Sequence, residues 1–107
     1  MDKRVVNRLH RKKPQPAKIT ETQIKGIIKQ YLSLKGWFHF YLLAGMACYP
    51  GAPDIIAIKD GITLYLEIKT FTGKLSDHQI EFQTNIEKHG GKYLVIRGID
   101  DLIQEGI

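Results

Sequence analysis

The sequence lacks the motifs of several common catalytic and metal sites. Cys48 is the only cysteine, so the chain can form neither an internal disulfide nor a zinc site built from several cysteines. The two serines, Ser33 and Ser76, lie outside any GxSxG motif, and the four histidines show no HExxH spacing. Neither a GxGxxG nor a GxxxxGK[ST] phosphate loop occurs. These absences argue against serine hydrolases, zinc proteases and the common nucleotide-binding folds.

Long apolar segments are also lacking. The longest apolar run, residues 37–49, is interrupted by His39 and Gly45 and is too short to span a membrane. The basic N-terminus is not followed by the apolar core of a signal peptide. With 107 residues, 43% of them apolar and 25% charged, the sequence predicts one small globular domain in the cytoplasm, with no membrane partner.

Acidic residues are scarce at the N-terminus. Residues 1–18 hold seven Lys or Arg against one Asp, a charge of +6, whereas the rest of the chain carries −1. We expect residues 1–18 to form a flexible basic arm and residues 19–107 to form the domain. A basic arm suits binding of nucleic-acid phosphates, with Lys12, Lys13 and Lys18 as DNA-contacting residues, although a solvated tail that aids solubility has the same composition.

What the sequence does contain is a hairpin with acidic residues at its open end. Asp60-Gly61 lies between two apolar, β-favouring runs, the strongest local signal for a two-residue turn. With Asp60 and Gly61 as the turn, the hairpin covers residues 54–60 and 62–69. Counting outward along both strands places Asp54 opposite Glu67, with Lys69 on the same face.

Facing carboxylates repel each other unless a cation lies between them. Mg²⁺ or Mn²⁺ is the natural cation, since either takes carboxylate oxygens, waters and substrate phosphates as ligands. Lys69 could hold an attacking water or neutralise charge that develops on a phosphate. The hairpin therefore predicts a metal-dependent site that cleaves phosphodiesters.

These residues resemble a known nuclease signature. Pro53-Asp54 followed by Glu67-Ile68-Lys69 resembles PD-(D/E)xK, and Gly51-Ala52-Pro53-Asp54 resembles the GxPD form of the VRR-NUC (virus-type replication–repair nuclease) domain. The resemblance covers roughly residues 20–107. It implies a restriction-endonuclease-like α/β fold, an αβββαβ core with a central mixed sheet flanked by helices.

The resemblance also implies further site residues. Glu21, in the first turn of the first helix, corresponds to an acidic residue that such nucleases often place near the metal; a first-turn glutamate can also simply complement the helix dipole. Gln79 corresponds to a helix glutamine that positions substrate or water, and it equally suits a capping box with Ser76. The carbonyl of Ile68 is a metal ligand by family habit, and Lys74 could contact a phosphate.

The remaining elements follow from local patterns. Thr20 and Gln23 form a capping box before an amphipathic stripe that contains Ile24, Ile28 and Leu32, and Gly36 can end that helix. Residues 36–43 indicate a buried aromatic strand, 76–89 a second helix, 92–97 a fourth strand, and 100–104 a closing helix capped by Asp100.

The sequence and the resemblance together predict a structure-selective DNA endonuclease. Stand-alone domains of this type act as homodimers on branched DNA such as Holliday junctions, which suits a phage or bacterial DNA-repair setting and, for a phage protein, the host cytoplasm. A flap or single-strand-specific nuclease is the alternative enzyme. A DNA-binding module that keeps the fold without turnover is the alternative from another class.

Overall fold

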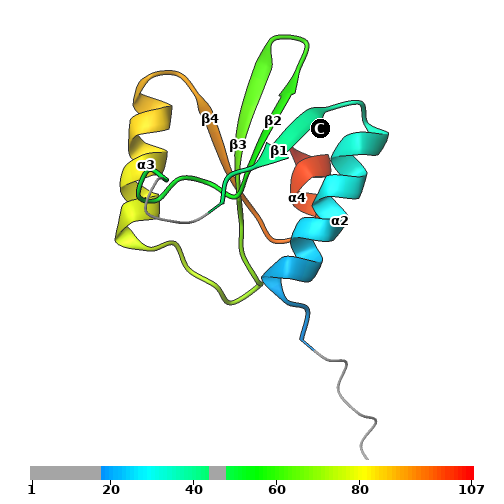
Figure 1. Ribbon diagram of the computed structural model, residues 1–107, viewed down its shortest axis with the longest axis horizontal. Helices are drawn as coiled ribbons and strands as arrows, with labels where there is room; N and C mark the ends of the chain where they lie inside the picture. The colour runs from blue at the N-terminus through cyan, green and yellow to red at the C-terminus, as the bar shows by residue number, and fades with distance from the viewer. Residues whose placement is uncertain (1–17, 44–47) are drawn as a thin grey trace, which may run out of the picture.

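The computed structural model describes residues 18–43 and 48–107. Helices and strands follow in the predicted αβββαβ order, with the predicted closing helix at the end (Figure 1). Their bounds are α2 (Glu21–Leu34), β1 (Phe38–Tyr41), β2 (Ile55–Lys59), β3 (Ile62–Ile68), α3 (Asp77–Lys88), β4 (Lys92–Ile96) and α4 (Ile99–Gln104). The N-terminal arm, apart from Lys18, lies outside the described residues.

The four strands form one mixed sheet in the order β1-β2-β3-β4. β1, β2 and β3 are antiparallel neighbours, whereas β4 runs parallel to β3. The β2–β3 turn has positive φ at both central residues, 51° at Asp60 and 78° at Gly61, as a type I′ turn requires. Lys59 pairs with Ile62 and Ile55 with Leu66, so the predicted hairpin register is confirmed.

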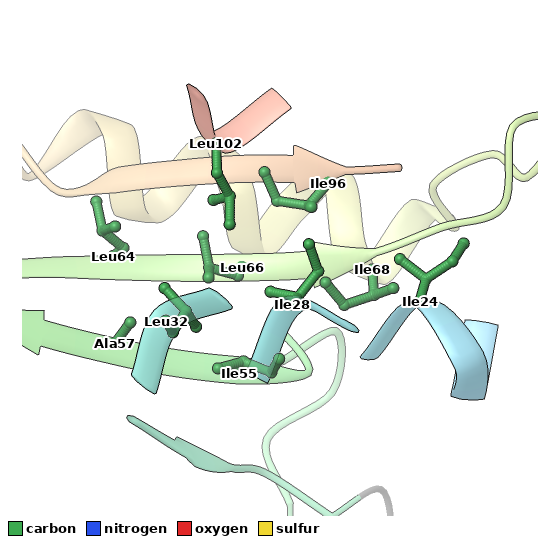
Figure 2. Close-up of a cluster of buried hydrophobic side chains, with 10 residues drawn as sticks. All are labelled: Ile24, Ile28, Leu32, Ile55, Ala57, Leu64, Leu66, Ile68, Ile96 and Leu102. Carbon is green, nitrogen blue, oxygen red and sulfur yellow. The ribbon is translucent and has the colours of Figure 1, made fainter. Parts of the chain in front are cut away.

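Helices cover both faces of the sheet. Figure 1 shows α3 on one side and α2 and α4 on the other. The side chains between the sheet and α2 and α4 form the apolar core drawn in Figure 2: Ile24, Ile28, Leu32, Ile55, Ala57, Leu64, Leu66, Ile68, Ile96 and Leu102. The opposite face carries the acidic residues, and an aromatic cluster there joins Phe82 of α3 to the rings of Tyr65 and Tyr93.

The ends of α2 and α3 form where the local sequence predicts. Thr20 and Gln23 make a reciprocal capping box, and so do Ser76 and Gln79. Gly36 follows the last turn of α2 with φ 80°, the conformation that ends a helix at glycine. Both helix starts are therefore held by side chain to backbone hydrogen bonds.

Two local predictions were wrong. The aromatic strand β1 is an exposed edge strand: Phe38 is 66% and Phe40 42% exposed, because β1 has a strand neighbour on one side only. The closing helix begins at Ile99 with Gly98 as its N-cap, so Asp100 lies in the first turn. The neighbouring Asp101 instead accepts a hydrogen bond from the Arg97 backbone N–H (2.7 Å).

Among the described residues, no helix is both long enough and apolar enough to cross a bilayer.

Candidate active site

Asp54 lies at the open end of the hairpin, one residue before β2 begins. Its Oδ2 accepts a hydrogen bond from the Ile68 backbone N–H (2.7 Å), and its carbonyl accepts one from Leu42 N–H (3.0 Å). Because Ile55 pairs with Leu66, Asp54 falls opposite Glu67, as the turn register predicts. Its other carboxylate oxygen, Oδ1, is 3.1 Å from the Lys25 Nζ of α2.

Glu67 is an acidic residue buried in the sheet, with 3% of its surface exposed. Gln79 Nε2 donates a hydrogen bond to Glu67 Oε1 (2.8 Å), and the Lys69 ammonium lies 3.9 Å from the same oxygen. The second oxygen, Oε2, is buried and has no hydrogen-bond partner. One carboxylate oxygen is thus held in place and the other remains available to a ligand.

The surroundings of Glu67 disfavour its charged form. Burial, followed by the negative charge of Asp54, raises the pKa of Glu67 from 4.5 to about 8; Lys69 opposes this rise and Glu21 adds to it. Burial and the charges of Glu67 and Asp54 also raise the pKa of the Tyr93 hydroxyl, a second buried group without a partner. A carboxyl group with so high a pKa is stabilised in its ionised form by a nearby cation.

Gln79 combines both roles that the sequence allowed. Its Oε1 accepts a hydrogen bond from Ser76 N–H (2.9 Å) within the capping box, while its Nε2 reaches Glu67. The first turn of α3 is also held against the loop before β2. A Cβ atom at Gly51 would lie only 2.1 Å from the carbonyl oxygen of His78, and Gly51 has φ +79°. Only glycine fits this approach without strain.

The carboxylates line an open cleft of about 570 Å³. Its wall is formed by α2, the residues before β2, the end of β3 and the start of α3, and it includes Lys25, Asp54, Glu67, Tyr49, His78 and Gln79. The cleft lies at the end of the sheet where β3 ends, and both α2 and α3 begin at this end (Figure 1). Two helix N-termini therefore face the side of the molecule that holds the carboxylates, which favours a negatively charged ligand.

The donor set suits a hard divalent cation. Lys69 N–H donates to the Ile96 carbonyl of β4 (3.0 Å), and within one trans peptide group the C=O and the following N–H point to opposite sides. The Ile68 carbonyl therefore points toward the Asp54 side. This carbonyl, Asp54 and the free oxygen of Glu67 supply the oxygen ligands that Mg²⁺ and Mn²⁺ prefer.

Glu21 is only loosely associated with this pair. It lies half-buried in the first turn of α2, and its charge contributes to the raised pKa of Glu67. Within residues 18–43 and 48–107, however, no three His, Cys, Asp or Glu side chains come close enough together to hold a metal ion. The structure thus brings Asp54, Glu67, Lys69 and Gln79 together, with Glu21 acting on them through its charge.

Two of the lysines expected to contact DNA are described. Lys18 and Lys74 are exposed, while Lys12 and Lys13 lie outside the described residues.

Sequence reasoning missed Lys25, whose ammonium group pairs with Asp54. The available signal was its spacing, because Lys25 follows Glu21 by four residues and so shares its face of α2. It also missed Tyr93, whose place in β4 beside the acidic face follows only from the parallel pairing of β3 and β4.

Solved structures with a similar fold include the following two. A structure described as "VRR_NUC domain" has a TM-score of 0.69 and 22% sequence identity, covering 78% of this chain and 94% of its own. Another, "VRR_NUC domain protein", has a TM-score of 0.68 and 21% identity, covering 82% of this chain and 85% of its own. No family model matches the sequence, and no curated protein matches it either. The chain therefore has the fold of VRR-NUC domains, the fold that its GxPD and ExK motifs predicted.

Proposed function

We propose that this domain is a metal-dependent endonuclease that hydrolyses phosphodiester bonds in DNA. The observation that carries the proposal is the pair of facing carboxylates, Asp54 and Glu67. One Glu67 oxygen is buried without a partner, and burial and charge disfavour the ionised side chain unless a cation is near. The likeness of the fold to VRR_NUC domains supports the same chemistry.

Asp54, Glu67 and the Ile68 carbonyl would hold Mg²⁺ or Mn²⁺. When bound, the cation supplies Lewis acidity at the scissile phosphate and lowers the pKa of a water. Gln79 fixes the orientation of the Glu67 carboxylate through its Nε2 donor. Lys69, near Glu67 Oε1, orients the attacking water and stabilises negative charge on the phosphate oxygens.

The proposed substrate is branched DNA, cut by a homodimer. A domain of this size contacts little of a long duplex, and two related sites suit symmetric cleavage of a four-way junction. Shape and deformability of DNA, rather than base contacts, would then select the substrate. The basic residues 1–18 add electrostatic affinity for the backbone.

The test compares labelled four-way junction, 5′-flap, linear duplex and single-stranded DNA, each with Mg²⁺, Mn²⁺ or EDTA. Wild type is run beside Asp54→Asn, Lys69→Ala and a control, Lys88→Ala, which removes an exposed lysine from the last turn of α3. We expect paired, symmetric nicks in the junction that require the metal, are lost in Asp54→Asn and Lys69→Ala, and persist in the control.

Other outcomes are equally informative. Preferential cutting of the flap or the single strand would keep the site and replace the substrate. Tight binding without cleavage in either metal would refute the nuclease and favour a binding module with the nuclease fold. Cleavage that survives EDTA would refute the metal-dependent mechanism.

A further inference from the structure

The loop that joins β3 to α3 begins at Lys69, directly after the last residue of β3. In Figure 1 this segment connects the end of β3 to the start of α3 and passes the end of the sheet at which α2 and α3 begin. The loop also packs on the catalytic lysine itself: a Cβ atom at Gly73 would be 3.4 Å from Lys69 Cδ and 3.2 Å from Thr70 Oγ1. The loop is therefore in contact with a residue of the candidate site.

Arg97 holds the loop in one conformation. Its Nη1 donates hydrogen bonds to the carbonyl oxygens of Thr70, Phe71 (3.3 Å) and Gly73 (2.7 Å). The Gly73 N–H closes the turn onto the Thr70 carbonyl (3.1 Å). Arg97 follows β4 directly and its backbone N–H donates to Asp101, so the backbone of Arg97 is held by the sheet and by α4.

At the tip of this braced loop, Phe71 is 87% exposed. Its role in folding is therefore small, since an aromatic ring stabilises a fold by leaving water. The surrounding charge indicates what the ring meets instead. The segment from Ile68 to Ser76 contains Lys69 and Lys74 and no acidic residue, and Lys18, three residues before α2, is exposed.

An exposed aromatic ring among cations, on a loop that is already ordered, fits a single-stranded nucleic acid: lysines contact the phosphates and the ring meets a base. We propose that Phe71 stacks on an unpaired base of the bound DNA, next to the scissile phosphate. The inference rests on the proposed function for the identity of the partner. It adds a residue that makes the site prefer DNA with unstacked bases, because bases inside an intact duplex offer no free face to the ring.

Two variants separate stacking from loop damage. Phe71→Ala removes the ring, and Phe71→Trp keeps an aromatic surface. Leu34→Ala is the matched control, because Leu34 is 86% exposed at the opposite end of α2. Each protein is titrated, with Ca²⁺ in place of Mg²⁺, against a single strand carrying 2-aminopurine and against the same strand in a full duplex. Cleavage of both DNAs, and of the four-way junction, is then measured with Mg²⁺.

Loss of one base stack weakens binding by roughly thirtyfold, the middle of the range for such aromatics. We expect this loss for Phe71→Ala on the single strand only, together with loss of 2-aminopurine quenching. Affinity for the duplex should be unchanged, Phe71→Trp should restore both signals, and Leu34→Ala should match wild type.

Several results would overturn the inference. An equal loss on single strand and duplex would mean that the substitution disturbs the loop. An unchanged affinity for the single strand would mean that Phe71 meets no base. A change from dimer to monomer on sedimentation of Phe71→Ala would assign the ring to a protein interface. If wild type binds these DNAs with the expected preference but cuts neither them nor the four-way junction, the nuclease proposal fails and the stacking of Phe71 on a base stands.

Discussion

The titration of Glu67 by itself should lower the free energy of unfolding of the metal-free protein as the pH rises. Because the pKa of Glu67 is raised from 4.5 to about 8 in the folded protein, the folded state holds a proton that the unfolded chain releases above pH 4.5. The free energy of unfolding then falls with rising pH across this window, by about 1.4 kcal/mol for each pH unit. Between about pH 5.5 and about pH 8 the loss reaches roughly 3 kcal/mol, a large fraction of the stability of a small domain.

The assay is urea unfolding in EDTA at both pH values, followed by fluorescence of Trp37, the only tryptophan, which packs partly buried against the core. In Glu67→Gln the side chain at this position cannot titrate. Between the two pH values the free energy of unfolding of this variant should therefore fall by about 3 kcal/mol less than that of wild type. Mg²⁺ should stabilise wild type more at high pH, where it competes with fewer protons. Parallel pH dependences for wild type and Glu67→Gln would refute the reasoning.

Further predictions concern packing, the cleft and the C-terminus. In urea unfolding, Gly51→Ala should cost on the order of 2 kcal/mol or more, because the added methyl collides with α3 at a positive φ; Gly61→Ala, with similar φ and open space, should cost about 1 kcal/mol from strain alone. Calorimetric titration of Mn²⁺ should show up to about fivefold tighter binding to Lys25→Met, because the ammonium no longer competes for Asp54, and weaker binding would contradict this. Tyr31→Phe should lower the free energy of unfolding by about 1 kcal/mol, since the Tyr31 hydroxyl donates a hydrogen bond to the Ile107 carbonyl (2.7 Å). An unchanged urea midpoint would show that water replaces this bond.

The sequence predicted best what depends on a few neighbouring residues. The Asp60-Gly61 turn fixes the hairpin register, because both positions need positive φ and a slip by one residue would exchange the two faces. From that register alone, Asp54 falls opposite Glu67. The two capping boxes were predicted for the same reason, since each is a contact across three residues.

What the sequence could not supply depends on contacts between distant elements. The aromatic run of β1 correctly indicates a strand, but its exposure follows from its place at the sheet edge, which no local pattern encodes. Lys25 reaches Asp54 only because α2 packs on the sheet in an orientation that brings its first turns to the start of β2. The brace from Arg97 to the loop after Lys69 likewise requires the parallel pairing of β4 with β3, between segments more than twenty residues apart.

The two capping boxes of this chain look alike in sequence but tolerate different substitutions. Gln23 serves only the start of α2, so glutamate, the other residue common at this position, can replace it and still accept the same backbone hydrogen bond. Gln79 must in addition donate to Glu67, which a carboxylate cannot do, and a third negative charge would then face the acidic pair. The choice between glutamine and glutamate is therefore neutral in one helix and decisive in the other. In homologous sequences, variation at these two positions would distinguish a residue kept for helix formation from one kept for the site.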